Sequence, residues 1–328
     1  MTQIPGFIDL QVNGCKCVDF SDKTLTAETC ADACQNLLSC GTAAFLATVI
    51  TSDTMTYRQN LAILAEIIED RAFKGKVLGI HAEGPFISKK PGAVGAHNPA
   101  WVKRPSLKFF EKMQKWAKGR IKMITLAAET QGAAELTRHL VKQGIVVSLG
   151  HQMAGYEDMA RLADAGAQSI THLGNAMPNQ VHRHHNTLLA GLAEERLTAL
   201  IVADGHHLPV FVIQSTLHAK GLDNTIVTSD ASPIAGCKPG AYQVLGNRAI
   251  LRRDGLLYNP DKKCMVGSSF TMLECMNWLL RRKLLSPAEL MQVGFTNPLR
   301  LIRVRSPAIK SQRQIKYDKQ NNQFIISQ

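Results

Sequence analysis

Eight short apolar runs, rich in β-branched residues, recur along the chain and alternate with stretches of helical spacing. The runs are GFIDLQV, TAAFLATVI, KVLGIHAE, IKMITLAAE, IVVSLGH, SITHLGNA, LTALIVAD and NTIVTSD. Their apolar residues are continuous rather than alternating, which is typical of strands buried on both faces. Strand followed by helix, eight times over, predicts a parallel sheet, and the count of eight favours a closed (β/α)8 TIM barrel over an open sheet.

The last strand–helix unit is expected to carry an insertion. Residues from about 237 to 266 are predicted to form a β excursion that turns at Gly246-Asn247 and Asp254-Gly255. The tail is predicted to form two short strands around Asn321-Asn322. We therefore expect a barrel over residues 4–304, with this excursion, and a small incomplete β adjunct over residues 305–328.

Composition narrows the class of protein. The chain has 328 residues, of which 45% are hydrophobic and 20% charged, so a sizeable core is expected. No apolar run reaches the roughly 18 residues of a membrane helix, and MTQIPGFIDLQ lacks the pattern of a signal peptide. We expect a cytoplasmic protein without a membrane partner. Its eight cysteines form no CxxC pair, so a disulfide framework is not expected.

The formal net charge of +12 raises the question of nucleic acid. Much of the basic excess lies late in the chain, without interleaved aromatic residues, and only 6% of all residues are aromatic. A solvated basic face is therefore expected rather than a nucleic-acid site. Attraction of an anionic substrate is the alternative interpretation.

Polar side chains gather where the predicted strands end, and the carboxyl ends of barrel strands form the active-site mouth. A single histidine there is more often structural, and a single carboxylate often caps the next helix. Histidine, histidine, glutamate and aspartate from four different strands are harder to explain in that way. The polar residues at or just after the strand ends are Asp9, Gln11, Asn13, His81, Glu83, Glu129, His151, His172, Asn175, Asp204, His206, His207 and Asp230.

Two imidazoles, one carboxylate and one open position form a common catalytic zinc site. We therefore expect Glu83, which ends the third run, to face a divalent metal. Asp230, at the end of the eighth run, is then placed to take a proton from water and to return it to a leaving group. Glu129 and Asp204 are assigned supporting roles, and His81 either packs in the core or supports the site.

Seven motifs, in the same order from about residue 5 to residue 300, resemble those of the N-acetylglucosamine-6-phosphate deacetylases of the amidohydrolase superfamily. They are PGFIDLQVNG, GIHAEGPF with AHNP downstream, VSLGH, THLGNAMP, ADGHH, TSDASPIAG and VGSSFTM. The resemblance implies a TIM barrel that converts N-acetyl-D-glucosamine 6-phosphate to D-glucosamine 6-phosphate and acetate, in amino-sugar metabolism.

The resemblance also implies roles for single residues. Glu83, His151 and His172 would bind one divalent metal, Zn²⁺ in the first instance, with Fe²⁺, Co²⁺, Mn²⁺ or Ni²⁺ as alternatives. Asp230 would be the catalytic acid and base. The residues implied in binding the sugar phosphate are His97, Asn175, Ala176, His207 and Arg183. Arg183 would reach the phosphate from the neighbouring subunit, which implies a homodimer.

Two departures from the resemblance matter. Many amidohydrolases carry HxH at the end of the first strand and bind a second metal there, whereas this chain has Gln11 and Asn13. Neutral amides are poor zinc ligands, so one metal per chain is expected. Relatives also usually have some tens of residues before PGFID, so residues 305–328 are expected to be the C-terminal remnant of an incomplete small β domain.

Three alternatives remain at this point. One is the same reaction on another acylamino sugar phosphate, such as N-acetylgalactosamine 6-phosphate. Another is an amidohydrolase of different specificity, for instance a deaminase. The third is a non-catalytic relative of the enzyme.

Overall fold

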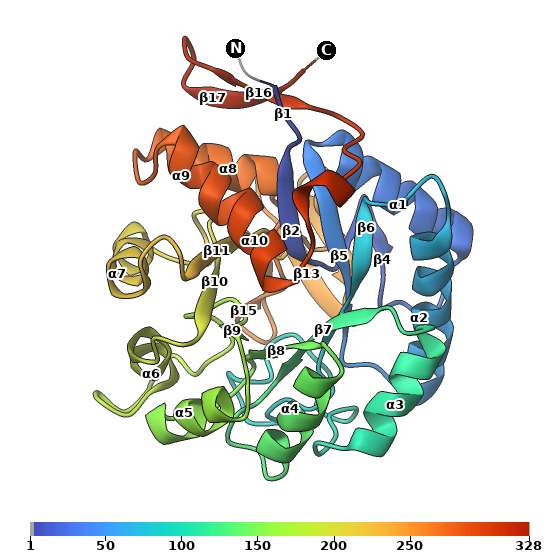
Figure 1. Cartoon of the computed structure of the whole chain (residues 1–328), viewed down its shortest axis with the longest axis vertical. Coiled ribbons are helices and arrows are strands. Elements are labelled where there is room, and N and C mark those ends of the chain that lie inside the picture. Colours follow the sequence, from blue (N-terminus) through green and yellow to red (C-terminus); the bar gives the residue numbers. More distant parts are fainter. Residues whose placement is uncertain (1–2, 328) are drawn as a thin grey trace.

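The computed structural model describes residues 3–327, and its centre is a sheet of eight parallel strands surrounded by helices (Figure 1). The hydrogen-bonded order of the strands is β11-β10-β9-β8-β7-β6-β5-β2, so neighbours in sequence are neighbours in the sheet. These strands are β2 (Phe7–Val12), β5 (Thr42–Ile50), β6 (Val77–Glu83), β7 (Ile121–Leu126), β8 (Val146–Leu149), β9 (Ser169–Ile170), β10 (Thr198–Val202) and β11 (Thr225–Thr228). The predicted TIM barrel is confirmed.

The barrel closes between its first and last strands through side chains as well as backbone. Asp9 on β2 accepts hydrogen bonds from the Thr228 hydroxyl at 2.6 Å and from the Ser229 amide at 3.1 Å. One isolated parallel bridge joins Val12 to Ala231. We call this junction the seam. Its residues Ser229 and Ala231 lie on either side of Asp230 in the chain.

Helices cover the outside of the sheet (Figure 1). They are α1 (Ala27–Ser39), α2 (Thr54–Glu69), α3 (Leu107–Trp116), α4 (Ala133–Lys142), α5 (Tyr156–Asp164), α6 (Thr187–Ala193), α7 (Val210–Lys220) and α8 (Met272–Arg281). The helices α1, α4 and α5 each stop before a glycine with a left-handed backbone, at Gly41, Gly144 and Gly166, where φ is 85°, 79° and 100°. Only glycine adopts that conformation readily, which accounts for the predicted helix ends.

The barrel interior is packed at the end opposite the site. Ile8, Leu10, Leu46 and other inward side chains are fully buried there. Phe295 and residues 299–302 close this end, from the π-helical turn Gln292–Thr296 and helix α10 (Asn297–Leu301), which follow α9 (Pro287–Met291). A cavity at the barrel axis can therefore open only at the carboxyl ends of the strands.

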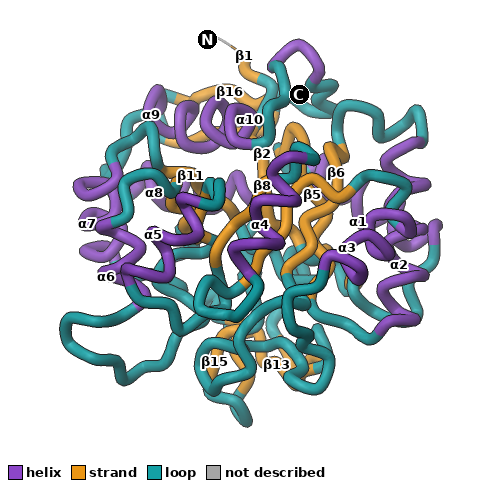
Figure 2. The backbone as a smooth tube through the Cα atoms, turned by 60° about the horizontal axis from the view of Figure 1, so that its bottom comes forward, coloured by secondary structure: helices purple, strands orange, loops and turns teal. Residues whose placement is uncertain are grey.

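Three small sheets are added to the barrel. Strands β1 (Gln3–Ile4), β16 (Ile315–Asp318) and β17 (Gln323–Ile326) pair beside the termini, and β3 (Gly14–Cys15) pairs with β4 (Val18–Asp19). The excursion forms a four-stranded antiparallel sheet of β12 (Gly240–Val244), β13 (Asn247–Leu251), β14 (Leu257–Asn259) and β15 (Cys264–Met265). Figure 2 places the excursion at the end of the molecule opposite the termini. Gln328, the last residue of the predicted tail, lies outside the described residues.

The first turn of the excursion differs by one residue from the prediction. Its central residues are Leu245 and Gly246, both with positive φ (52° and 68°), whereas Asn247 already belongs to β13. The side chain of Asn247 is buried and donates hydrogen bonds to the carbonyl oxygens of Ala96, at 2.9 Å, and Leu245, at 2.6 Å. These two contacts hold Asn247 inside the sheet and move the turn back by one position.

Within the described residues, no helix has both the length and the apolar character that crossing a membrane requires.

Candidate active site and metal centre

The four residues assigned to the metal and to proton transfer all lie at the carboxyl ends of barrel strands. Glu83 is the last residue of β6, because the following Gly84-Pro85 offers no proline N–H to continue the ladder. His151, His172 and Asp230 each lie two residues beyond the end of β8, β9 and β11. All four residues are at most 8% exposed. They therefore meet at the mouth of the barrel.

Three of these residues have an unusual backbone. His151, His172 and Asp230 are in the left-handed region, with φ of 50°, 30° and 50°. Such a conformation in a residue other than glycine costs about 1–3 kcal/mol and is concentrated at functional sites. The turn after each strand thus directs the side chain toward the mouth of the barrel.

The donor atoms of Glu83, His151 and His172 converge on one point. Glu83 Oε1 lies 3.0 Å from His172 Nε2 and 3.2 Å from His151 Nε2, and the two imidazole nitrogens are 3.1 Å apart. Three ligands held at about 2.0–2.1 Å around a tetrahedral zinc ion lie roughly 3.3–3.4 Å from one another. The triangle in this structure is therefore close to the size that a metal would impose.

The hydrogen bond at His151 Nδ1 is compatible with a cation at this point. Its Nδ1 lies 2.8 Å from the carbonyl oxygen of Ala93, which can only accept, so Nδ1 carries the proton and Nε2 presents a lone pair. The Glu83 oxygen opposite also presents lone pairs. A positive charge between these two atoms, 3.2 Å apart, would stabilise the contact, either as a proton on Nε2 or as a bound cation. A glutamate with two histidines suits a divalent metal of the zinc type.

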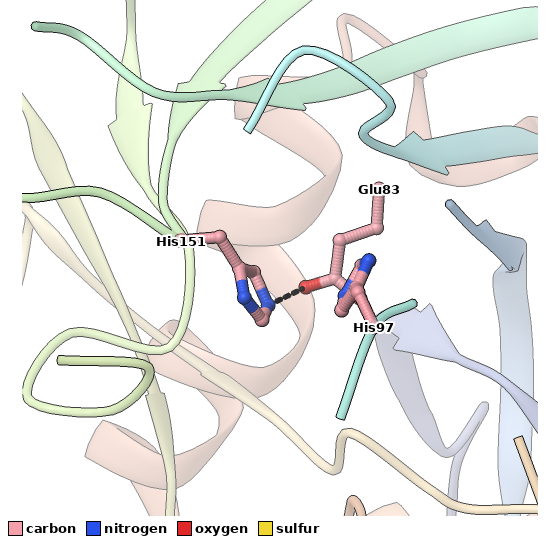
Figure 3. Close-up of side chains that lie close together, drawn as sticks. All are labelled: Glu83, His97 and His151. Atoms are coloured by element: carbon pink, nitrogen blue, oxygen red, sulfur yellow. Dashed lines mark ion pairs between the residues drawn. The ribbon is translucent and has the colours of Figure 1, made fainter. Parts of the chain in front are cut away.

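His97 is a fourth group at the same site, and Figure 3 shows its ring beside Glu83 and His151. Ligand atoms of these three residues lie within 4.8 Å of one another. However, His97 Nε2 is 3.6 Å from the other oxygen of Glu83, whereas His172 is closer at 3.0 Å. Because the His172 contacts are the shorter ones, Glu83, His151 and His172 are the stronger candidate metal-binding set, with His97 as its neighbour.

Charge and burial shape the site together. Burial alone would raise the pKa of Glu83, but the imidazoles of His151, His172 and His97 outweigh it and hold that pKa well below its usual range. Burial lowers the pKa of His172, but the hydrogen bond and charge of Glu83 raise it overall. Burial, together with His151, lowers the pKa of His97 to about 4, so this ring is neutral. Glu83 is the fixed negative charge of the cluster.

Asp230 faces this cluster across the mouth. Asn13 Nδ2 donates to Asp230 Oδ1 at 2.8 Å, and His207 Nε2 lies 3.9 Å from Asp230 Oδ2. Burial, followed by repulsion from Glu83, raises the pKa of Asp230 to about 6. A carboxyl with a pKa near neutrality can both accept and release a proton.

Asp204 and His207 form a second buried pair next to Asp230. His207 Nδ1 donates to Asp204 Oδ2 at 2.7 Å, and the backbone amides of His206 and His207 both donate to Asp204 Oδ1. Burial opposes both charges, but mutual attraction lowers the pKa of Asp204 and raises that of His207. This pair turns His207 Nε2 toward Asp230.

The two amides at the end of β2 act as hydrogen-bond donors. Gln11 Nε2 donates to Glu83 Oε1 at 2.8 Å, and Asn13 donates to Asp230 as described. Both side chains are buried, and each leaves its oxygen without a partner among residues 3–327. Each of the two carboxylates thus has a neutral amide beside it, and neutral amides are poor ligands for zinc.

A cavity of about 1010 Å³ opens above these residues. One side of its lining includes Glu83, His151, His172 and Asp230. The other side includes residues 89–99, which we call the His97 loop, together with residues 174–179 and part of the excursion. Pockets for small molecules commonly have volumes of about 300–1,000 Å³. The cavity is therefore large enough for a small phosphorylated sugar.

The remaining predicted site residues lie in different places. Asn175, Ala176 and His207 line the cavity, and Ala176 has a left-handed backbone with φ of 49°. Arg183 is exposed in the loop before α6 and does not line the cavity of its own chain. His81 lies beneath the site, with ring nitrogens 3.0 Å from the Leu10 carbonyl oxygen and 2.8 Å from the Thr125 hydroxyl.

Some features of the site were missed by sequence reasoning. Lys89, Lys262 and Lys263 line the cavity, and Lys262 Nζ donates to the Ala96 carbonyl oxygen at 3.3 Å. Thr51 lies beside His97, with its hydroxyl 2.9 Å from His97 Nδ1. The charge of the excursion in DKKC was the available signal for Lys262 and Lys263, whereas no local pattern indicates Thr51.

Comparison with known proteins gives consistent results. The Amidohydrolase family model matches residues 2–306. The N-acetylglucosamine-6-phosphate deacetylase of Bacillus subtilis (strain 168) is 34% identical over 275 residues, which cover 83% of this chain and 68% of that protein. The N-acetylgalactosamine-6-phosphate deacetylase of Escherichia coli O157:H7 is 26% identical over 301 residues, covering 92% and 78%.

A solved structure extends this agreement to the fold. The crystal structure of N-acetyl-D-glucosamine-6-phosphate deacetylase from Mycobacterium smegmatis matches with a TM-score of 0.88 and 25% identity, covering 100% of this chain and 86% of that chain. The chain spans about two thirds to three quarters of the length of the curated bacterial relatives it matches. The chain belongs to the amidohydrolase family, and within it to the group of N-acetylglucosamine-6-phosphate deacetylases.

Proposed function

We propose that this chain is a metal-dependent hydrolase that deacetylates N-acetyl-D-glucosamine 6-phosphate to D-glucosamine 6-phosphate and acetate. The observation that carries the proposal is the triangle of Glu83, His151 and His172 with Asp230 facing it inside one cavity. Relatives named for this deacetylation, at 34% identity and below, support the choice of substrate.

One divalent metal, Zn²⁺ in the first instance, would be held by Glu83, His151 and His172. Such a metal acidifies water and polarises an amide carbonyl when it is bound. Gln11 orients Glu83 through the 2.8 Å hydrogen bond, and the Ala93 carbonyl oxygen fixes the tautomer of His151. Both contacts hold the donor atoms in place.

Asp230 supplies the proton transfers of the reaction. It takes a proton from the water that attacks the acetamide carbon, and it gives that proton to the sugar nitrogen as the C–N bond breaks. Acetate and the free amine are the two products. Asn13 holds Asp230 in position, and His207, turned by Asp204, lies on the opposite side of the carboxyl.

His97 is placed to stabilise the charge that develops on the acetamide oxygen. Its Nδ1 lies 3.3 Å from the Thr51 amide, which donates to it, so Nε2 carries the proton of the neutral ring. That N–H points into the site beside Glu83. A donor fixed in a buried site is the usual means of stabilising an oxyanion.

The sugar phosphate is assigned to the outer part of the cavity. Asn175, Ala176 and His207 line it, and Lys89, Lys262 and Lys263 add positive charge at its rim. We further propose that Arg183 reaches the phosphate in the cavity of a second copy of the chain, in a homodimer. Light scattering tests this role. A fully active monomer would show that Arg183 from a second copy is not needed.

The test of the reaction is acetate release from N-acetylglucosamine 6-phosphate by zinc-loaded protein, with a chelated sample as control. Acetate is expected only from the metal-loaded sample. Release of ammonia instead would favour a deaminase, and no release from folded, metal-loaded protein would favour a non-catalytic relative.

A second substrate is favoured by a specific observation. Two relatives named N-acetylgalactosamine-6-phosphate deacetylase match this chain at 26% and 28% identity over 301 residues. Parallel assays on the two epimers decide between them, and the higher kcat/KM identifies the preferred sugar.

A further inference from the structure

Two cysteines that are far apart in the sequence meet at the seam. Cys17 Sγ lies 3.2 Å from Cys237 Sγ, although 220 positions separate them in the chain. Cys17 lies in the turn between β3 and β4, and Cys237 lies on the loop that follows Asp230. A disulfide bond is about 2.05 Å long, so the two sulfurs need to approach by about 1.2 Å to form one.

The backbone around the pair is already fixed. The amide of Lys16 donates to the Ala235 carbonyl oxygen at 3.0 Å, and the amide of Cys17 donates to that of Pro233 at 2.7 Å. The Asn13 amide likewise donates to the Ala231 carbonyl oxygen at 2.7 Å. These bonds hold the two loops side by side, with the two sulfurs 3.2 Å apart.

The conformation of Cys17 is a second, independent observation. Lys16 and Cys17 have φ of 47° and 69°, in a tight turn where Asn and Gly are the favoured residues. A cysteine at this position adds strain to the fold and places an exposed thiol beside Cys237. Strain of this kind is more often found where a side chain has a task.

We propose that Cys17 and Cys237 are a redox-sensitive modification site that forms a reversible disulfide with hydrogen peroxide as oxidant. Cys17 is exposed and reacts first, whereas Cys237 is partly buried. Burial, with Cys17 nearby, raises the pKa of Cys237 to about 11, which keeps it a thiol until its partner has reacted.

The chemistry balances in two steps. The Cys17 thiol loses its proton, the thiolate attacks one peroxide oxygen and the O–O bond breaks. A sulfenic acid forms, and the departing hydroxide takes up the proton that the thiol lost, as the first water. The Cys237 sulfur then attacks the Cys17 sulfur, the S–O bond breaks, and the departing hydroxide takes the Cys237 proton as a second water. Two thiols are oxidised by two electrons while one peroxide is reduced to two waters.

The disulfide would join the loop after the first barrel strand to the loop after the last. Those loops carry Asn13 and Asp230, whose side chains are hydrogen-bonded. A cross-link between such distant positions restricts the unfolded chain and stabilises the closed barrel. Oxidation is therefore expected to raise the melting temperature by several degrees, and reduction by dithiothreitol to reverse the rise.

The test uses the full chain treated with hydrogen peroxide, alkylated and mapped by peptide mass spectrometry. The expected product is one peptide pair joined through Cys17 and Cys237, with a loss of two hydrogen atoms from the intact mass. Cys17→Ser and Cys237→Ser should lose both the linkage and the melting shift. Cys264→Ser, a matched change at a partly buried cysteine on β15, should keep both.

The opposing results are equally definite. Cys17 found as a sulfinic acid while Cys237 remains alkylatable would overturn the proposal, as would a linkage between two copies of the chain. Failure to find any linkage in the folded wild-type protein would also overturn it. The mapping of the wild-type protein does not depend on the folding of any variant.

Discussion

The two sides of the cavity are built in different ways. One side, which we call the strand-end wall, consists of Glu83, His151, His172 and Asp230, each within two residues of a barrel strand and buried. The other, the loop wall, consists of the His97 loop and the excursion, which meet through hydrogen bonds from Asn247 and Lys262 to one carbonyl oxygen. The register of the sheet fixes the first, whereas a few polar contacts hold the second.

This difference suggests a division of work. Except for His97, the groups assigned to the chemistry lie at the ends of barrel strands, whereas the lysines assigned to the phosphate lie on segments that can vary. Lys262 and Lys263 are exposed at the rim, while Glu83 is 3% exposed. Changes to the strand-end wall and to His97 should therefore affect turnover, and changes to the lysines of the excursion should affect substrate binding.

The largest effect is expected from Glu83→Gln, which removes the fixed negative charge of the metal-binding set. Removing a residue that hydrogen-bonds to a metal ligand lowers metal affinity by about 10–100-fold, so removing the ligand itself should lower it further. Metal content after dialysis, measured by plasma mass spectrometry, should fall to background together with turnover. Glu129→Gln is the matched control, because Glu129 accepts from the Met153 amide and is not one of the ligands.

Asp230→Asn should separate proton transfer from metal binding on the same wall. We expect turnover to fall by about 10²–10⁴-fold, because the amide cannot accept and return the proton. Metal content should stay at the wild-type value. Asp254→Asn, at an exposed site on the excursion, is the matched control and should leave turnover unchanged. Turnover of Asp230→Asn within tenfold of wild type would contradict the assignment.

Lys262→Gln tests the loop wall. The proposed contact between Lys262 and the sugar phosphate is partly solvated, so it contributes little to the free energy of binding. Its loss should raise KM for the phosphorylated sugar by roughly three- to tenfold. We expect kcat to change little, and KM for unphosphorylated N-acetylglucosamine to stay the same. Lys112→Gln on α3 makes the same change away from the cavity. Equal loss with both sugars would argue against a phosphate contact.

The smallest expected effect is on the pH dependence of the free energy of unfolding. The pKa of His207 is raised above 6.5 in the folded protein, despite burial, by Asp204. Protonated His207 therefore stabilises the fold fully below pH 6.5, and this contribution is lost as pH rises through the folded pKa. Urea unfolding of chelated protein should show a decline toward alkaline pH that is smaller in His207→Gln. An identical decline in both proteins would contradict the ionised pair.

The sequence allowed the barrel to be predicted because its strands are buried on both faces and so appear as continuous apolar runs. Their ends are less well marked by the same pattern. The run IKMITLAAE predicts a strand up to Glu129, whereas β7 ends at Leu126. Ala127 and Ala128 remain fully buried after the hydrogen bonds of the strand have ended. An apolar run records burial, and it does not record where backbone pairing stops.

The site could be predicted only in part. Its polar residue types at strand ends are visible in the sequence, but the left-handed turns at His151, His172 and Asp230 are not, because no glycine marks them. Contacts such as Asn247 with Ala96 join residues 151 positions apart. A single sequence carries no local signal for pairs of this kind, which depend on how the excursion folds back.

The most direct test is a titration of metal-free protein with Zn²⁺ while acetate release from N-acetylglucosamine 6-phosphate is followed. Glu83, His151 and His172 offer one set of ligands, and the neighbouring Gln11 and Asn13 are neutral amides. This arrangement predicts that activity rises linearly and stops rising at one equivalent per chain. A rise that continues to two equivalents would contradict the single-metal site. Full activity in the metal-free protein would contradict the metal-dependent reaction itself.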